Sequence, residues 1–103
     1  MIHPSIQPHL PKVFELFEQH KIKNAYLFGS VLTSNFNEDS DVDFLVNVDS
    51  SIEPAIMGGH LWDLIYELQD LLNRHIDLLT ERSLKNPYFI QQINNAKLPI
   101  YGF

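Results

Sequence analysis

The residues best suited to chemistry in this sequence are a glycine–serine pair and three aspartates. Gly29-Ser30 closes a short apolar run, ten residues separate Ser30 from Asp41, and Asp43 follows two positions later. Asp77 lies inside a second apolar run. Carboxylates are the preferred ligands of hard divalent cations, and glycine-rich backbone can hold a phosphate through its amides. The spacing therefore predicts metal-assisted chemistry at phosphorus.

Asp41 and Asp43 should project together from one face of a strand. Residues two apart in a strand share a face, so Val42 between them would point the opposite way, into the core. Clustered carboxylates repel one another, and a divalent cation relieves that repulsion. Because the set offers only oxygen, it favours Mg²⁺ or Mn²⁺ over zinc. Two such ions about 4 Å apart form the clamp used for in-line attack at phosphorus.

Apolar periodicity and turn residues divide the chain into the elements that must position these groups. In chain order we expect an N-terminal arm over residues 1–8, a helix from Leu10, a strand over 24–29, a helical turn within 30–35, a strand over 41–48, a long helix after Gly58-Gly59 that ends near Arg74, a strand over 75–80, a short helix from Asn86-Pro87 to Asn94-Asn95, and a last edge strand or tail that contains Pro99. The predicted fold class is α/β (α+β): a small mixed β-sheet of three to four strands flanked by helices.

The order of these elements explains how distant residues could meet. A long helix between the second and third strands is the connection that parallel strands require. Both strands would then begin at one end of the sheet, which brings Asp77 to Asp41 and Asp43. If the first strand is antiparallel to the second, Gly29-Ser30 arrives at the same end. The convergence depends on these three strands being neighbours.

Size and composition limit the class of protein. The 103 residues fit one domain over 1–103, and 45% hydrophobic content suffices for a small core. A net charge of −6 with only seven lysines and arginines argues against general nucleic-acid binding, so we expect no direct DNA binding. There is no cysteine, and we see no signal peptide or run long enough to span a membrane. A soluble, cytoplasmic protein is the default expectation.

Plainer interpretations of the same residues remain open. A D-x-D pattern alone also occurs in solvated turns, and what favours a site is its combination with Gly-Ser and the third aspartate. The five histidines fit structural or surface roles, and His75 draws interest because it lies two positions before Asp77. Trp62 and Tyr66 on the long helix suggest packing or an interface. We therefore expect the protein to associate with a second protein or with itself, as a hetero-oligomer or homo-oligomer.

The motif resembles that of a known family. Gly29-Ser30, ten residues, then Asp41-x-Asp43 is similar to the signature of minimal nucleotidyltransferases of the DNA polymerase beta-like superfamily. "IDLLT" at residues 76–80 resembles that family's third-aspartate strand. The resemblance extends from about residue 10 to the end of the chain.

The resemblance implies a Mg²⁺-dependent transfer of AMP from ATP, with two metal ions expected and Mn²⁺ as a possible substitute. Asp41 and Asp43 would ligate both metals. Asp77 would ligate the one that holds the acceptor hydroxyl and assist in its deprotonation. Gly29 and Ser30 would hold the triphosphate. Many stand-alone members are antitoxins of HEPN-type ribonuclease toxins, and some transfer AMP to a tyrosine of that toxin.

One departure from the family pattern keeps an alternative open. Members often carry an arginine and a second glycine soon after Gly-Ser, whereas this chain reads "VLTSN" at residues 31–35. Lys85, Arg74 or Arg82 could supply the missing positive charge. The alternative is a catalytically weak antitoxin that neutralises its partner by forming a complex. Transfer to a small molecule ranks lower, because larger relatives use an added substrate domain for it.

Overall fold

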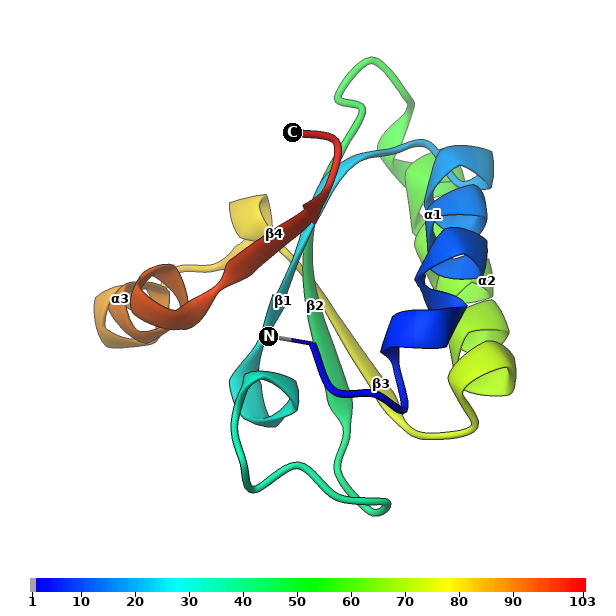
Figure 1. Ribbon diagram of the computed structural model, residues 1–103. Helices are drawn as coiled ribbons and strands as arrows, with labels where there is room; N and C mark the ends of the chain where they lie inside the picture. Colours follow the sequence, from blue (N-terminus) through cyan, green and yellow to red (C-terminus); the bar gives the residue numbers. More distant parts are fainter. Residues whose placement is uncertain (1) are drawn as a thin grey trace.

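A four-stranded sheet with helices on both faces forms the framework of the protein. The computed structural model describes residues 2–103. Its elements, in chain order, are η1 (Gln7–His9), α1 (Leu10–Gln19), β1 (Ile22–Phe28), η2 (Gly29–Leu32), β2 (Val42–Val48), α2 (Pro54–Leu72), β3 (Ile76–Thr80), η3 (Glu81–Ser83), α3 (Pro87–Ala96) and β4 (Leu98–Tyr101). This confirms the predicted class, a small mixed sheet flanked by helices (Figure 1).

The strand order β3-β2-β1-β4 makes the first three strands neighbours, as the predicted meeting of the site residues requires. β1 is antiparallel to β2, and β2 is parallel to β3. The amino ends of β2 and β3 therefore lie beside the carboxyl end of β1, where η2 begins. β4 pairs with the free edge of β1 and contains Pro99, which cannot donate a ladder hydrogen bond and so fits an edge.

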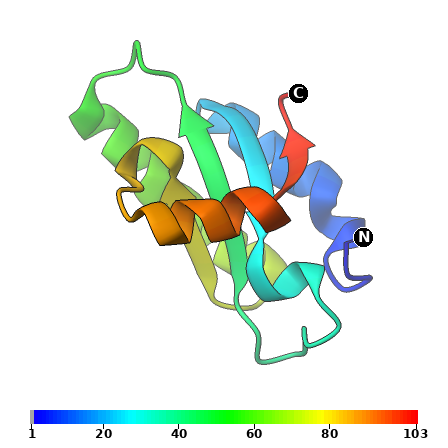
Figure 2. The ribbon, with the colours of Figure 1, turned by 90° about the vertical axis from the view of Figure 1, so that its left-hand side faces the viewer.

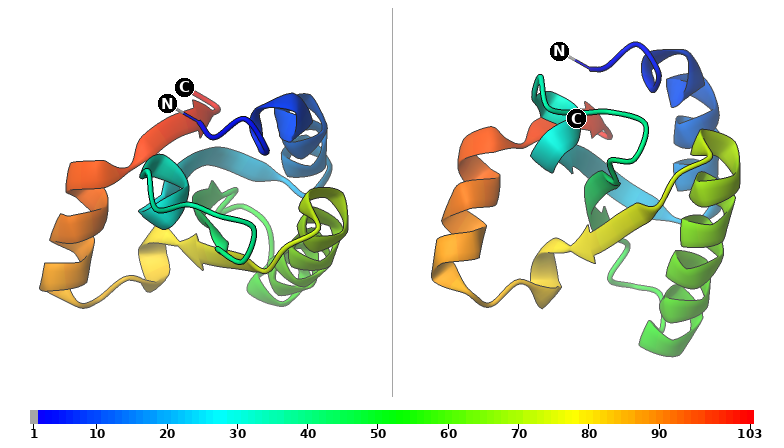
Figure 3. Two further views of the ribbon diagram at one scale, coloured as in Figure 1. Left: turned by 60° about the horizontal axis from the view of Figure 1, so that its bottom comes forward. Right: turned by 90° about the horizontal axis from the view of Figure 1, so that it is seen from below.

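One face of the sheet carries the main core beneath α1 and α2 (Figures 1 and 3). Phe17 of α1 meets Phe44 of β2 edge to face, with ring centroids 5.6 Å apart. Leu64 and Leu68 of α2 are fully buried against the same layer. Since these side chains leave water completely, this face supplies most of the hydrophobic stabilisation.

The long helix begins earlier than the sequence suggested. We expected it after Gly58-Gly59, but α2 starts at Pro54, because proline is well suited to a first helical turn and Met57 gains burial there. Two consecutive glycines weaken a helix without ending it. The helix ends at Leu72, and Asn73 adopts the left-handed conformation typical of a helix terminus.

α3 crosses the opposite face of the sheet, as Figure 2 shows. Asn86 caps it by accepting hydrogen bonds from the amides of Tyr88 and Phe89, as predicted, but the helix runs one residue past the expected end at Asn94-Asn95, to Ala96. Ile93 packs there in a small second cluster with Phe28 and Leu45. This face of the sheet is therefore only partly covered by α3.

The N-terminal segment before α1 contributes one side chain to the main core. Ile6 is fully buried there, and the η1 turn leads directly into α1. The sequence did not indicate this burial, because single buried residues in a proline-rich stretch carry no periodic pattern. No helix among residues 2–103 is long and apolar enough to cross a membrane.

Candidate active site

Four polar side chains gather where β2 and β3 begin. Asp43 pairs with Asp77 in the register of the parallel strands. One step toward the amino ends, the amide of Val42 donates to the carbonyl of His75 at 3.1 Å, which sets Asp41 beside His75. Alternating side chains share a face, so all four project on the α3 side of the sheet, opposite to buried Val42. The three predicted aspartates are thus brought together.

Gly29 brings the backbone of β1 against this group. Its φ is +79°, and a Cβ atom added there would collide with the carboxylate of Asp43. Phe28 before it pairs with Asp43 across the strands. Glycine is therefore required at this position both for conformation and for space. Ser30 follows in the η2 turn, where its carbonyl accepts hydrogen bonds from the amide and hydroxyl of Thr33.

Asp43 has the most perturbed carboxylate of the site. Its pKa is raised from 3.8 to about 6, chiefly by burial and then by a hydrogen bond and charge repulsion from Asp77 and the charge of Asp41, while His75 acts to lower it. A cation would remove both causes, because it compensates the lost hydration and the repulsion. The carboxylate is therefore held in a place that favours a bound positive charge.

Asp41, His75 and Asp77 form a more exposed group beside Asp43. Each offers a ligand atom, and these atoms all lie within 4.8 Å of one another. Nδ1 of His75 is 3.5 Å from Asp41 and 4.0 Å from Asp77. The sequence drew attention to His75 through its distance of two residues from Asp77, but it did not assign the ring to the site.

The loop that leads from η2 to Asp41 is held by Arg74. A single guanidinium nitrogen donates to the carbonyls of Asn37 and Ser40, both at 2.8 Å, and the group stacks on the ring of Phe36 at 4.4 Å. Arg74 is therefore occupied in positioning the loop that presents Asp41. It does not take the place of the missing phosphate-binding arginine.

The two other basic candidates make no hydrogen bond or ion pair with the carboxylates among residues 2–103. Arg82 borders a hollow with Val48 and Pro54, at the carboxyl end of β2. Lys85 is exposed in the segment before α3. The segment from Gly29 to Asp43 itself contains no lysine or arginine.

A mainly apolar cavity of about 230 Å³ adjoins Gly29. It is lined by Phe28, Gly29, Phe89, Gln92, Ile93 and Ala96. The cavity lies between the end of β1 and α3, so a molecule whose charged part lies at Gly29 could extend its apolar part into it. Gln92 adds one amide, which can both donate and accept a hydrogen bond.

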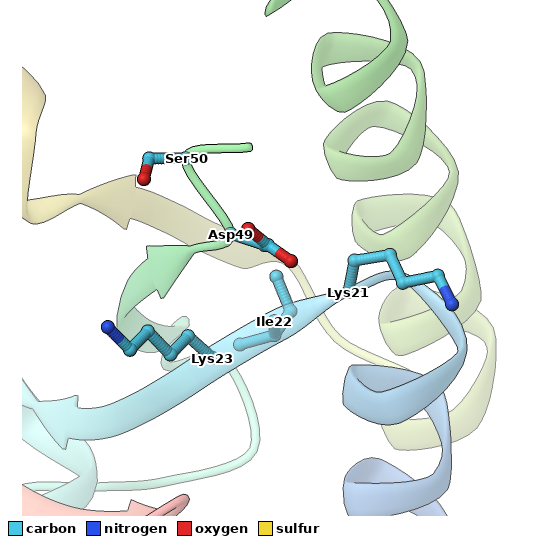
Figure 4. Close-up of a pocket in the computed structure, with 5 residues that line it drawn as sticks. All are labelled: Lys21, Ile22, Lys23, Asp49 and Ser50. Atoms are coloured by element: carbon cyan, nitrogen blue, oxygen red, sulfur yellow. The ribbon is translucent and has the colours of Figure 1, made fainter. Parts of the chain in front are cut away.

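A second hollow, of about 320 Å³, lies at the opposite end of the sheet and is unrelated to the carboxylate group. Lys21, Ile22, Lys23, Asp49 and Ser50 line it (Figure 4). The two lysine side chains point in different directions in Figure 4, so they do not converge on one ligand. Hydrogen bonds from the amide and hydroxyl of Ser51 to Oδ1 of Asp49 lower the pKa of this carboxylate.

Two histidines meet that the sequence treated as separate. Nδ1 of His20 lies 3.1 Å from Nδ1 of His60, and Nε2 of His20 lies 3.0 Å from a carboxylate oxygen of Glu67. Forty residues separate the two histidines, so no local spacing could indicate the contact. His20 is buried between α1 and α2, on the face of the sheet away from the aspartates.

Comparisons with known proteins agree on one family. The family model described as "Nucleotidyltransferase domain" matches residues 10–99. A relative from Methanocaldococcus jannaschii, named "Putative protein adenylyltransferase MJ1379", is 33% identical over 78 residues, which cover 76% of each chain.

Solved structures share the fold. One described as "putative minimal nucleotidyltransferase" has a TM-score of 0.77 and 26% identity, and the match covers 97% of each chain. Another contains a tri-AMPylated Shewanella oneidensis HEPN toxin in complex with an MNT antitoxin. It has a TM-score of 0.66 and 23% identity and covers 94% of this chain and 72% of the other. At that identity, the second likeness concerns the fold alone.

Proposed function

The chain belongs to the nucleotidyltransferase domain family, and from this premise we propose that it transfers AMP from ATP to a hydroxyl group of a partner protein. The observation that carries the proposal is the register that sets Asp43 beside Asp77, with Asp41 two residues before and Gly29 packed against them. The relative named as a protein adenylyltransferase supports a protein as acceptor.

Each site residue has a role in the proposed reaction. The acceptor oxygen attacks the α-phosphorus of ATP, the bond to the leaving pyrophosphate breaks, and the acceptor proton is lost to Asp77 or to water. Gly29 and Ser30 orient the triphosphate with backbone amides. We place the nucleoside in the apolar cavity between Gly29 and α3, where Phe89 offers an aromatic face.

The residues present fit divalent metal ions. Asp41, Asp43 and Asp77 supply oxygen ligands from three positions, and the raised pKa of Asp43, chiefly caused by burial, supports a cation there that would compensate the lost hydration. Bound Mg²⁺ ions would stabilise the charge that develops on the phosphoryl oxygens. We propose that Asp41 and Asp43 hold both ions and that Asp77 holds the ion nearest the acceptor.

The proposed partner is a HEPN-type ribonuclease toxin, and the proposed acceptor is one of its tyrosines. The solved complex of an AMPylated HEPN toxin with an MNT antitoxin supports this pairing. Exposed aromatic side chains offer contact surface, because Trp62 and Tyr66 on α2 are 63% and 55% exposed. In this role the chain acts as the antitoxin and modifies the toxin.

The second candidate is an antitoxin that acts by binding alone. It is favoured by the absence of a basic residue between Gly29 and Asp43 and by the engagement of Arg74 in the loop. A site without a cationic side chain would hold a triphosphate less firmly. In this case complex formation alone would neutralise the toxin.

Transfer of label from α-labelled ATP to the toxin tests the proposal. In the presence of Mg²⁺, wild-type protein should label the toxin, whereas the double variant Asp41→Ala, Asp43→Ala should not. Label transfer that survives the double substitution would show that these aspartates are not the active site.

Toxin neutralisation in the same variant separates the two candidates. The enzyme proposal predicts that the double variant still forms the complex but no longer protects cells. Protection by the double variant, with no label on the toxin, would establish the binding antitoxin instead.

A further inference from the structure

We propose that His75 is an additional metal ligand, which acts with Asp41 and Asp77 and gives the site a preference for transition-metal dications over Mg²⁺. The inference rests on the proposed function, since it concerns the metal of the same site. Oxygen ligands alone predict Mg²⁺ or Mn²⁺, and the imidazole changes that expectation.

Strand pairing fixes the position of His75. The hydrogen bond from the amide of Val42 to the carbonyl of His75 extends the β2–β3 ladder by one residue, next to the pair formed by Val42 and Ile76. His75 and Asp77 are two residues apart and therefore share a face. The ring is thus directed to the carboxylates by the sheet, and no loop motion is needed to bring it there.

The distances match a shared ion. Nδ1 of His75, Oδ2 of Asp41 and Oδ1 of Asp77 are separated by 3.5 Å and 4.0 Å along the two histidine contacts. Adjacent ligands of an ion bound at about 2.1 Å lie roughly 3 Å apart, and opposite ligands roughly 4 Å apart. One ion can therefore contact all three atoms after small rotations of exposed side chains.

The type of ligand atom determines which metal ion binds more tightly when His75 takes part. Neutral imidazole is a good ligand for Co²⁺, Ni²⁺ and Zn²⁺, whereas Mg²⁺ prefers carboxylate and water oxygen. The contact between His75 and Asp41 could instead be a surface ion pair. Both side chains are about half exposed, however, and exposed ion pairs contribute little to folding stability. Metal binding therefore accounts better for a ring placed between two carboxylates.

The His20–His60 contact does not compete as a ligand set. The two nitrogens of His20 face different partners, His60 on one side and Glu67 on the other. These donors do not converge on one point. Variants of this pair therefore provide a matched control for the loss of an imidazole.

Calorimetric titration of the metal-free full chain with Co²⁺ and with Mg²⁺, without nucleotide, tests the proposal. The measured quantity is the ratio of the Mg²⁺ to the Co²⁺ dissociation constant. His75→Asn should lower this ratio by about tenfold or more, mainly by weakening Co²⁺ binding. His60→Asn should leave it within twofold of wild type. A ratio unchanged in His75→Asn, or lowered equally by both variants, overturns the proposal.

Imidazole NMR signals give an independent readout on the wild-type protein. Co²⁺ is paramagnetic, so at equal amounts of metal and protein it should shift or broaden the ring signals of His75 before those of the other four histidines. Signals of His75 that persist unchanged at saturating Co²⁺ would overturn the proposal even if the variant failed to fold.

The outcome is distinguishable from failure of the proposed function. If AMP transfer requires Asp41 and Asp43 but the ratio of dissociation constants is unchanged in His75→Asn, only the assignment of His75 as a ligand is wrong. If transfer survives loss of the two aspartates, the proposed active site is wrong whatever the ratio shows.

Discussion

The charged carboxylate of Asp43 is unfavourable for folding, although it belongs to the proposed active site. Its carboxylate is half buried between Gly29 and Asp77, and its pKa is raised to about 6 chiefly because burial removes hydration. A folded state that binds a proton more tightly than the unfolded state is most stable at low pH. Without a metal ion, the charged carboxylate therefore destabilises the fold near neutral pH.

Asp43→Asn should stabilise the metal-free protein near pH 7 while abolishing AMP transfer. The contribution of Asp43 is favourable below about pH 4 and is lost as the pH rises from 3.8 through about 6, so the wild type should fall behind the variant over this window. Allowing for solvent screening, the difference should reach about 1 to 2 kcal/mol. Urea unfolding with a chelator at several pH values measures it. A difference that does not vary with pH would contradict the assignment.

Gly29→Ala should damage both stability and the site. The φ of +79° disfavours alanine, and the new Cβ would push the carboxylate of Asp43 aside. We expect a loss of about 2 kcal/mol or more and little remaining transfer activity. Gly58→Ala is the matched control, because nothing lies within 4 Å of that Cβ in α2 and alanine favours the helix by about 0.5 to 1 kcal/mol. Equal effects of the two substitutions in thermal unfolding would refute this role of Gly29.

At the scale of elements, the site follows from how three strands are connected. The crossover helix α2 makes β2 and β3 parallel, and the antiparallel β1 returns Gly29 to their amino ends. Ligands of doubly wound sheets bind at carboxyl ends of strands, and this site differs because β1 is reversed. The pairing of the strands therefore brings the site residues together, whereas the loop that leads from η2 to Asp41 is held by other contacts.

Arg74→Lys should loosen that loop. A lysine cannot bridge the carbonyls of Asn37 and Ser40 while stacking on Phe36. Hydrogen exchange of amides over 36–41 should accelerate, and AMP transfer should fall on the order of tenfold because Asp41 is less well positioned. Arg82→Lys, at the other end of the sheet, should change neither. Unaltered exchange in Arg74→Lys would show that the loop is held by other contacts.

The sequence predicted the strands and the three-aspartate group well, because period-two patterns and a long connecting helix fix direction and face. It placed the start of α2 too late, since Gly58-Gly59 looked like an interruption and the burial of Met57 is a tertiary effect. The roles of Arg74 and of the His20–His60 pair could not be predicted. Both depend on contacts between residues more than 30 positions apart.

At the scale of the whole molecule, the two faces of the sheet are covered to different extents. Two helices close one face around the core, while α3 crosses the other face (Figure 2), where the side chains of Asp41 and Asp77 are exposed. Tyr88 on α3 is 81% exposed, and Trp62 and Tyr66 on α2 contact each other at the surface. A small acidic protein with exposed aromatic side chains is suited to binding a partner, as the antitoxin proposal requires.

Intact-mass spectrometry of the HEPN-type toxin after incubation with this protein, ATP and Mg²⁺ measures directly whether the toxin is modified. We expect the toxin to gain the mass of one or more AMP units, and the gain to disappear with Asp41→Ala, Asp43→Ala although the complex still forms. A toxin of unchanged mass in a fully formed complex with the wild-type protein would contradict this expectation.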